Sequence, residues 1–263
     1  MVNQPDNCAE IERVNILGVG VSAIRIPETL EFIACCIARH QPTYIVVASV
    51  HTIVSAYRRV AFRSLVNRAG LVTPDGMPLV LLCRRWGYPG TERVYGPDLM
   101  LAVCEQAARS GDRHFFYGGQ PGVPEEVARR LQERFPGLPV AGTYSPPYRD
   151  LTPEEEEAVT SMINDAQPDV VWVALGSPRQ EAWIAAHRDR LDAPVLIGVG
   201  YAFDIHSGRL PQAPRWMQRA ALEWLFRLWI EPRRLWKRYL VNNPLFVILV
   251  ILQILKRRLA CSE

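Results

Sequence analysis

The sequence predicts an α/β protein with a Rossmann-like, open and mostly parallel sheet, helices on both of its faces and a helical C-terminal appendage. Short apolar runs alternate with amphipathic stretches as far as about residue 200. Uninterrupted runs such as VVWVAL (170–175) suit strands that are covered on both faces. After about Ser207 the alternation stops, so we expect an α/β catalytic domain at 1–207 and an appendage at 208–263.

The expected strands are short and rich in apolar residues, and amphipathic helices separate them. Strands are expected at 15–21, 44–48, 71–73, 114–117, 140–144, 170–175 and 195–199. Helices are expected at 29–39, 52–68, 77–86, 98–109, 124–135, 153–165 and 180–190. The clearest helix start is at Thr152, where a capping hydroxyl precedes Pro153 and two glutamates. Ligands of such sheets usually bind at the carboxyl ends of the strands.

The appendage is divided by prolines into short helical segments, because proline starts and breaks helices. Segments 222–229 and 235–240 are amphipathic, and the apolar run LFVILVILQIL follows at 245–255. A helix of eleven residues reaches about 16 Å, roughly half of a ~30 Å hydrocarbon core. We therefore expect it to lie in one leaflet with tryptophans and arginines at the headgroups. A buried helix or a dimer interface is the alternative.

Positive charge is concentrated in the appendage. The chain has 30 Lys and Arg against 27 Asp and Glu, a net charge of +3. Ten of the basic residues, but only two acidic ones, lie between Arg215 and Arg258. This cationic stretch predicts an anionic partner such as phosphate, lipid headgroups or nucleic acid.

The six cysteines form no CxxC pair and have no histidine at zinc-finger spacing. The first fifteen residues are polar and do not have the pattern of a signal peptide. We therefore expect a cytoplasmic chain whose cysteines are reduced.

A glycine-rich turn offers one alternative function. Residues Gly18 to Ala23 match GxGxxA, which opens a dinucleotide site in NAD(P)-dependent oxidoreductases. Such a site requires an acidic residue at the end of the second strand, where this chain has only Val46 to Val50. A tight turn that needs small residues is the simpler interpretation.

Polar side chains follow several of the expected strands. Asp75 lies in a Pro-Asp-Gly sequence, which is turn chemistry but also places a carboxylate where it can act as a general base. Arg93 precedes a glycine turn, and either a phosphate or a surface ion pair would suit it. Gln180 begins a helix after a buried strand, and Asp204 follows the last strand. Strand ends that meet at one edge of the sheet would bring Asp75, Gln180 and Asp204 together.

Several common motifs do not occur in the sequence. There is no Asp-x-Asp, the usual metal-binding motif of nucleotide-diphosphate sites, and neither GxxxxGK[ST] nor GxSxG. Neutralising a departing diphosphate would then fall to arginines.

Five blocks in order resemble the WecG/TagA/CpsF family, glycosyltransferase family 26, over about residues 14–246. They are TPDGMPLV, RVYGPDL, VALGSPRQEAWI, GVGYAFDIHSG and APRWMQRAALEWLFRLWIEPRRLWKRYL. The resemblance implies the fold called GT-E and an inverting enzyme that needs no metal or other cofactor. Such an enzyme moves a sugar from a UDP-sugar to a polyprenyl-diphosphate-linked sugar at the inner membrane face, in the synthesis of exopolysaccharides or other surface glycans.

The resemblance also implies roles for single residues. Asp75 matches the family's base. Arg93, Gln180 and Asp204 match pocket residues near the nucleotide sugar. Arg227, Arg234 and Lys237 match the appendage cations that steady the diphosphate and close the site. Family members usually have an arginine at the position of Lys237, which keeps the charge but lacks the bidentate fork.

Two departures leave the sugar open. The family often has Thr-x-Asn where this chain has Val47 to Ser49, with His51 following, and we expect both Ser49 and His51 to take part in substrate binding. Gln212 replaces a common arginine. Family members transfer N-acetylmannosamine, its uronic acid or glucose.

The resemblance implies no nucleic-acid partner. A non-catalytic protein that binds membranes or nucleic acid through the basic appendage remains an alternative function. A homo-oligomer is compatible with the sequence.

Overall fold

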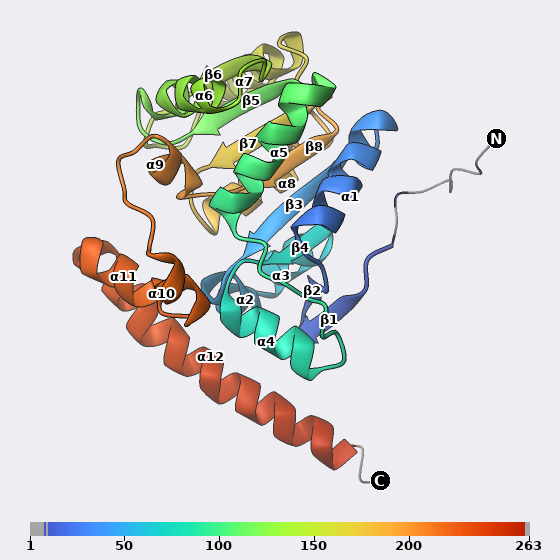
Figure 1. Cartoon of the computed structure of the whole chain (residues 1–263), viewed down its shortest axis with the longest axis vertical. Coiled ribbons are helices and arrows are strands. Elements are labelled where there is room, and N and C mark those ends of the chain that lie inside the picture. The colour runs from blue at the N-terminus through green and yellow to red at the C-terminus, as the bar shows by residue number, and fades with distance from the viewer. Residues whose placement is uncertain (1–7, 9, 261–263) are drawn as a thin grey trace, which may run out of the picture.

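Six parallel strands form an open sheet at the centre of the computed structural model, which describes residue 8 and residues 10–260 (Figure 1). The strands are β3 (Thr43–Ala48), β4 (Leu71–Pro74), β5 (His114–Gly118), β6 (Val140–Tyr144), β7 (Val170–Ala174) and β8 (Val195–Gly198). Their order is β4-β3-β8-β7-β5-β6. The predicted α/β fold with its parallel sheet is confirmed.

Helices cover both faces of the sheet. They are α1 (Ile26–Ala38), α2 (Val50–Arg58), α3 (Val60–Asn67), α4 (Met77–Arg85), α5 (Gly96–Ser110), α6 (Val123–Arg134), α7 (Pro153–Asp165), α8 (Arg179–His187) and α9 (Ala202–His206). The predicted start of α7 is confirmed, because Thr152 and Glu155 cap each other's backbone N–H groups at 3.3 and 2.9 Å. The single helix expected at 52–68 is instead two helices, α2 and α3, which meet at an extended Arg59.

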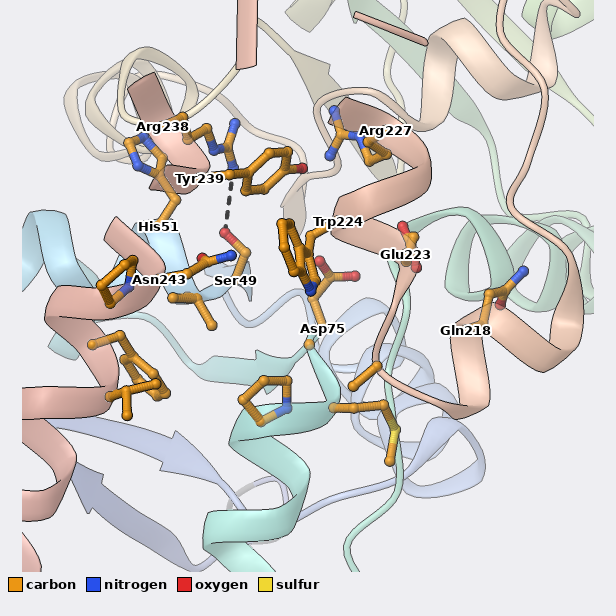
Figure 2. Close-up of a pocket in the computed structure, with 18 of the residues that line it drawn as sticks. Ser49, His51, Asp75, Gln218, Glu223, Trp224, Arg227, Arg238, Tyr239 and Asn243 are labelled. Carbon is orange, nitrogen blue, oxygen red and sulfur yellow. Dashed lines mark hydrogen bonds between the residues drawn. The ribbon is translucent and has the colours of Figure 1, made fainter. Parts of the chain in front are cut away.

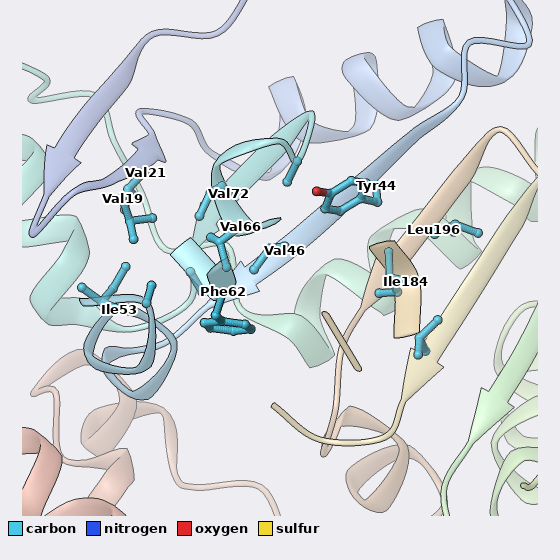
Figure 3. Close-up of a cluster of buried hydrophobic side chains, with 14 of the residues drawn as sticks. Val19, Val21, Tyr44, Val46, Ile53, Phe62, Val66, Val72, Ile184 and Leu196 are labelled. Carbon is cyan, nitrogen blue, oxygen red and sulfur yellow. The ribbon is translucent and has the colours of Figure 1, made fainter. Parts of the chain in front are cut away.

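Two apolar layers hold the sheet between the helices, because alternate strand residues point to opposite faces. Val46 and Leu196 pack with Ile53 of α2 and Phe62 of α3 on one face (Figure 3). Ile45 and the other residues of opposite parity pack against α1, α5, α6 and α9. Each fully buried valine, isoleucine or leucine contributes about 1.5–3 kcal/mol to folding. This rigid body fixes the strand ends that form the site.

The first expected strand is wrong, because residues 13–22 form a hairpin outside the main sheet. Strands β1 (Arg13–Ile16) and β2 (Val19–Ser22) pair antiparallel. Leu17 and Gly18 make the turn with φ of 53° and 90°, as a two-residue hairpin requires. The GxGxxA sequence therefore does not lie between a parallel strand and a helix, and the dinucleotide-binding alternative is wrong.

The appendage consists of α10 (Arg215–Arg219), α11 (Glu223–Ile230) and α12 (Pro232–Ala260), and α12 lies along one side of the body (Figure 1). The expected break at Pro244 is wrong. One helix of 29 residues, about 43 Å long, continues through it. An interior proline costs about 3 kcal/mol, but the helix buries Tyr239 before it and Phe246 after it against the body. Packing on both sides keeps the helix continuous.

Because α12 is much longer than the expected helix of eleven residues, its length no longer excludes a membrane span. Residues 232–257 are long and apolar enough to cross a membrane, by length and composition alone, and most of this stretch is not buried in protein. However, α12 is tied to the body along its length: Gln253 accepts a hydrogen bond from the Leu17 N–H at 3.1 Å, and Arg257 donates to the Asn15 carbonyl at 3.2 Å. The helix therefore has an inner, protein-bound face and an outer, exposed one.

The expectation that every cysteine is a free thiol is wrong for one pair, because Cys8 and Cys35 form a disulfide. Cys36, Cys83 and Cys104 are buried free cysteines, and burial raises the pKa of the Cys36 and Cys83 thiols to about 11. Cys261 and most of the polar N-terminal stretch lie outside the described residues.

Candidate active site

A cavity of about 530 Å³ lies where the ends of β3 and β4 meet the appendage (Figure 2). The body supplies residues that follow these two strands, and α11 and α12 supply the opposite side. Of the predicted site residues, the cavity is lined by Ser49, His51, Asp75, Arg93 and Arg227. The body and the appendage thus build this cavity together.

Asp75 lies directly after β4. Its backbone N–H donates to the Ala48 carbonyl at 3.0 Å, which fixes it beside the end of β3. Its Oδ1 accepts a hydrogen bond from the Gly96 N–H at 3.3 Å. Burial raises the pKa of Asp75 to about 6, and the nearby Arg93 guanidinium opposes this rise. At neutral pH the side chain is therefore ionised, yet more basic than an exposed aspartate.

Arg93 joins Asp75 to the appendage. Its Nε donates to the Asp75 carbonyl, its Nη2 forms an ion pair with Glu223, and its Nη1 donates to Gln218 Oε1 at 3.5 Å. Its guanidinium lies 3.9 Å from the centre of the Tyr95 ring. Arg93 and Glu223 are mostly buried, with 16% and 13% of their side chains exposed, so water screens this pair far less than a surface pair.

Glu223 fixes α11 against the body. Besides Arg93, its carboxylate accepts a hydrogen bond from the Tyr201 hydroxyl at 2.6 Å. Arg227 lies one helical turn further on, on the same face of α11, with its guanidinium 3.6 Å from the centre of the Tyr201 ring. Anchoring Glu223 thus places Arg227 at the cavity.

The end of β3 meets α12 on the other side of the cavity. Arg238 donates from Nη2 to Ser49 Oγ at 3.4 Å (Figure 2). The Asn242 amide lies 2.8 Å from His51 Nδ1. Burial and the neighbouring Arg238 lower the pKa of His51 to about 4, so its imidazole is neutral at physiological pH.

Four predicted site residues are not among those that line the cavity. Gln180 is buried beside Gly200, and its Oε1 has no hydrogen-bond partner within the described chain. Asp204 follows β8 in α9, where burial raises its pKa and Arg234 opposes the rise. Arg234 forms an ion pair with Glu231 at 2.6 Å, and Lys237 lies against Trp236.

The sequence reasoning missed several residues that line the cavity, among them Glu223, Trp224, Arg238, Tyr239 and Asn243. All lie in the appendage. Glu223 could have been found from its position four residues before Arg227. Arg238 lies in the expected segment 235–240, but only the packing of α12 against Ser49 shows that it faces the cavity.

The site combines one basic carboxylate with buried guanidinium groups. In the part of the chain that the structure describes, no group of three or more His, Cys, Asp or Glu side chains is placed to hold a metal ion. The Nε atoms of Arg227 and Arg238 are buried and have no partner among the described residues. A proton acceptor next to unpaired cationic donors suits the transfer of a group that leaves as an anion.

Comparisons with known proteins identify the family of the chain. The model of the glycosyl transferase WecG/TagA/CpsF family matches residues 14–260. Three relatives carry the name N-acetylglucosaminyldiphosphoundecaprenol N-acetyl-beta-D-mannosaminyltransferase. That from Bacillus spizizenii is 32% identical over 81% of this chain and 80% of its own, that from Bacillus subtilis 33% over 71% and 70%, and that from Staphylococcus aureus 29% over 89% and 91%. The chain thus belongs to the WecG/TagA/CpsF family of glycosyltransferases.

Proposed function

We propose that the protein is an inverting glycosyltransferase that moves a hexose from a UDP-sugar to a polyprenyl-diphosphate-linked sugar during the synthesis of an exopolysaccharide or a related surface glycan. The relatives' names specify an N-acetylmannosaminyl group and an undecaprenyl-diphosphate-linked acceptor. At about 30% identity these names support the substrate class. N-acetylmannosamine, its uronic acid and glucose are the candidate sugars.

Asp75 is the proposed base, and its position carries the proposal. It lies in the cavity with a raised pKa, next to the cations that an anionic leaving group needs. The acceptor hydroxyl gives its proton to the Asp75 carboxylate while its oxygen forms a bond to the anomeric carbon of the donor. The bond from that carbon to the UDP oxygen breaks, and the electron pair leaves with the diphosphate. Attack opposite the leaving group inverts the anomeric carbon.

Arginines replace a metal ion in this proposal. Arg227 and Arg238 line the cavity from the appendage, which places two guanidinium groups beside a diphosphate bound there. Charge-assisted bonds of this kind stabilise the charge that develops on the leaving group. Arg234 and Lys237 lie on α12, as Arg238 does. They are proposed to reach the diphosphate when the appendage closes over it.

The remaining predicted residues are proposed to bind the donor and the acceptor sugar. Ser49, His51 and Arg93 line the cavity itself. Gln180 and Asp204 follow neighbouring parallel strands, where ligands of α/β sheets bind. The buried Oε1 of Gln180 has no hydrogen-bond partner in the described chain, which suits a ligand hydroxyl bound near this strand end.

The appendage is also proposed to hold the enzyme at the inner face of the plasma membrane. Trp229, Trp236 and Ile251 are exposed on α11 and α12 among basic residues, and Trp229 is 87% exposed. Apolar and aromatic side chains with flanking cations bind the interface of anionic membranes. The contacts between α12 and the body favour a helix that lies on the membrane rather than one that crosses it.

One assay tests the proposal directly. Purified protein is incubated with a panel of UDP-sugars and a prenyl-diphosphate-linked N-acetylglucosamine, and the products are identified by mass. We expect one UDP-sugar to give a product heavier by one sugar residue, and nuclear magnetic resonance to show an inverted linkage. Release of UDP without a glycosylated lipid, or a retained linkage, would contradict the proposal.

A further inference from the structure

The cavity has a polar part and an apolar part. The body and the appendage both contribute polar groups, among them Asp75, Arg93, Arg227 and Arg238. The apolar part joins the start of α4 to α11 and α12. We call it the apolar wall, and it consists of Met77, Pro78, Trp224, Leu240, Pro244, Phe246 and Val247. A nucleotide sugar offers little apolar surface to bury against it.

The apolar wall continues onto the outside of the molecule. Leu240 and Val247 line the cavity, yet they are 58% and 54% exposed. Ile251 and Leu255, four and eight residues after Val247, extend the same exposed apolar surface further along α12. The cavity therefore has an apolar exit along α12, towards the surface proposed above to contact lipid.

We propose that the apolar wall binds the first isoprene units of the acceptor's polyprenyl chain. This inference rests on the proposed function and assigns the end of the acceptor that is not a sugar. The position of the wall supports it, because the wall begins in the cavity that contains Asp75 and ends on the exposed face of α12. From Arg238 to Val247 the helix rises by about 14 Å, and both residues line the cavity, so α12 brings a charged start and an apolar continuation to it.

This arrangement gives α12 a second task besides holding the enzyme at the membrane. The acceptor's reactive sugar has to reach Asp75 while most of its lipid chain stays in the bilayer. A wall that begins at the arginines and ends on the outer face of α12 provides apolar contact over that distance. The enzyme thereby selects acceptors with a prenyl tail over soluble sugar diphosphates, independently of how the polar groups of the site recognise the acceptor sugar.

The test uses water-soluble acceptors without vesicles or detergent, so that membrane partitioning does not contribute. Two acceptors carry the same sugar diphosphate, one with a tail of two isoprene units and the other with an ethyl tail. Burial of the longer tail against the wall is expected to lower KM at least tenfold in the unaltered enzyme. Equal KM values for the two acceptors would overturn the proposal.

Two neighbouring substitutions separate the wall from the general surface. Val247→Asp puts a carboxylate into the wall and is expected to remove most of the difference between the two acceptors. Ile248→Asp is the matched control, because Ile248 is 56% exposed but is not among the residues that line the cavity. It should keep the full preference for the prenyl tail. If the two variants behave alike, the wall is not the binding site.

A binding measurement keeps this test independent of the proposed reaction. Calorimetry compares geranyl diphosphate with inorganic diphosphate as ligands of the unaltered enzyme and of both variants. Tighter binding of geranyl diphosphate that only Val247→Asp abolishes would support the wall even if no sugar transfer is found. Equal binding of the two ligands would overturn it, whatever the enzyme's activity.

Discussion

The α/β body and the C-terminal appendage are built in opposite ways. In the body, strand residues such as Ile45 and Trp172 are fully buried between helices on both faces. In the appendage, no residue of α11 is fully buried, and α12 buries only one face. The body is therefore stabilised by its own core, whereas the appendage depends on contacts with the body and, in our proposal, with lipid. The site lies where these two regions meet.

Replacing the base in the body is expected to have the largest effect. Asp75→Asn keeps the size of the side chain but removes the proton acceptor, so kcat should fall by about 10²–10⁴ with little change in thermal stability. Initial rates and thermal unfolding measure both quantities. Asp192→Asn is the control, because Asp192 is exposed and is not among the residues that line the cavity. Near-normal turnover in Asp75→Asn would reject the role of the base.

Removing an appendage cation should have the next largest effect. Arg227→Ala deletes a guanidinium at the cavity, and a lost charge-assisted bond of about 1.5–3 kcal/mol corresponds to roughly a 10–150-fold decrease in kcat/KM. Arg227→Lys should recover only part of this activity, because lysine lacks the planar fork. Arg233→Ala removes an exposed cation of α12 and should leave kcat/KM unchanged. A similar loss in both alanine variants would indicate a general charge effect.

The outer face of α12 should govern membrane association without affecting the body. Ile251→Asp combined with Leu255→Asp charges two exposed apolar positions, and vesicle binding should fall at least tenfold. Flotation with anionic vesicles measures this binding. The paired control is Met162→Asp, which charges an exposed apolar residue of α7 in the body. Unchanged flotation of the double variant would show that α12 is not the membrane contact.

The smallest expected effect is a shift in pH dependence. Asp75 must be ionised to accept a proton, so activity should fall as the pH drops through about 6. The charges that face Asp75 are Arg93, Arg227 and Arg238, which favour ionisation, and Glu223, which opposes it. Glu223→Gln removes the opposing negative charge and breaks the ion pair between Glu223 and Arg93. Both changes are expected to lower the pKa of Asp75.

The acidic limb of the pH–rate profile should therefore move to lower pH in Glu223→Gln, by less than about one unit. Glu231→Gln, which alters the ion pair with the exposed Arg234, should leave the limb in place. A limb that moves upward, or that moves equally in both variants, would contradict this electrostatic coupling between the two regions.

The contrast between the body, with its own core, and the appendage, which depends on contacts with the body, explains what the sequence could predict. Residues 170–174 are all buried, so the apolar composition of such a run alone indicates a covered strand. Residues 15–21 were predicted as one strand, but a two-residue turn at Leu17 and Gly18 divides them into two antiparallel strands. The apolar pattern of this run does not show that the chain reverses direction. In the appendage, Pro244 indicated a break, but packing at Tyr239 and Phe246 outweighs its local cost.

The site was partly predictable for a related reason. Asp75 and Ser49 follow strands of a recognisable sheet, so their convergence follows from topology. Glu223 and Arg238 come from helices whose position is set by contacts with Tyr201 and Ser49, more than 20 residues away in the chain. The spacing of four residues from Arg227 points to Glu223, but no local pattern shows that Glu223 contacts Tyr201 or that Arg238 contacts Ser49.

In our proposal the arginines of the appendage hold the diphosphate of the UDP-sugar, while Asp75 of the body takes the proton of the acceptor hydroxyl at the same site. An experimental structure of the enzyme with bound UDP tests it most directly. We expect the diphosphate within hydrogen-bond distance of Arg227 and Arg238, with the Asp75 carboxylate facing the position of the transferred sugar. A diphosphate that is held elsewhere, out of reach of Arg227 and far from Asp75, would contradict the account.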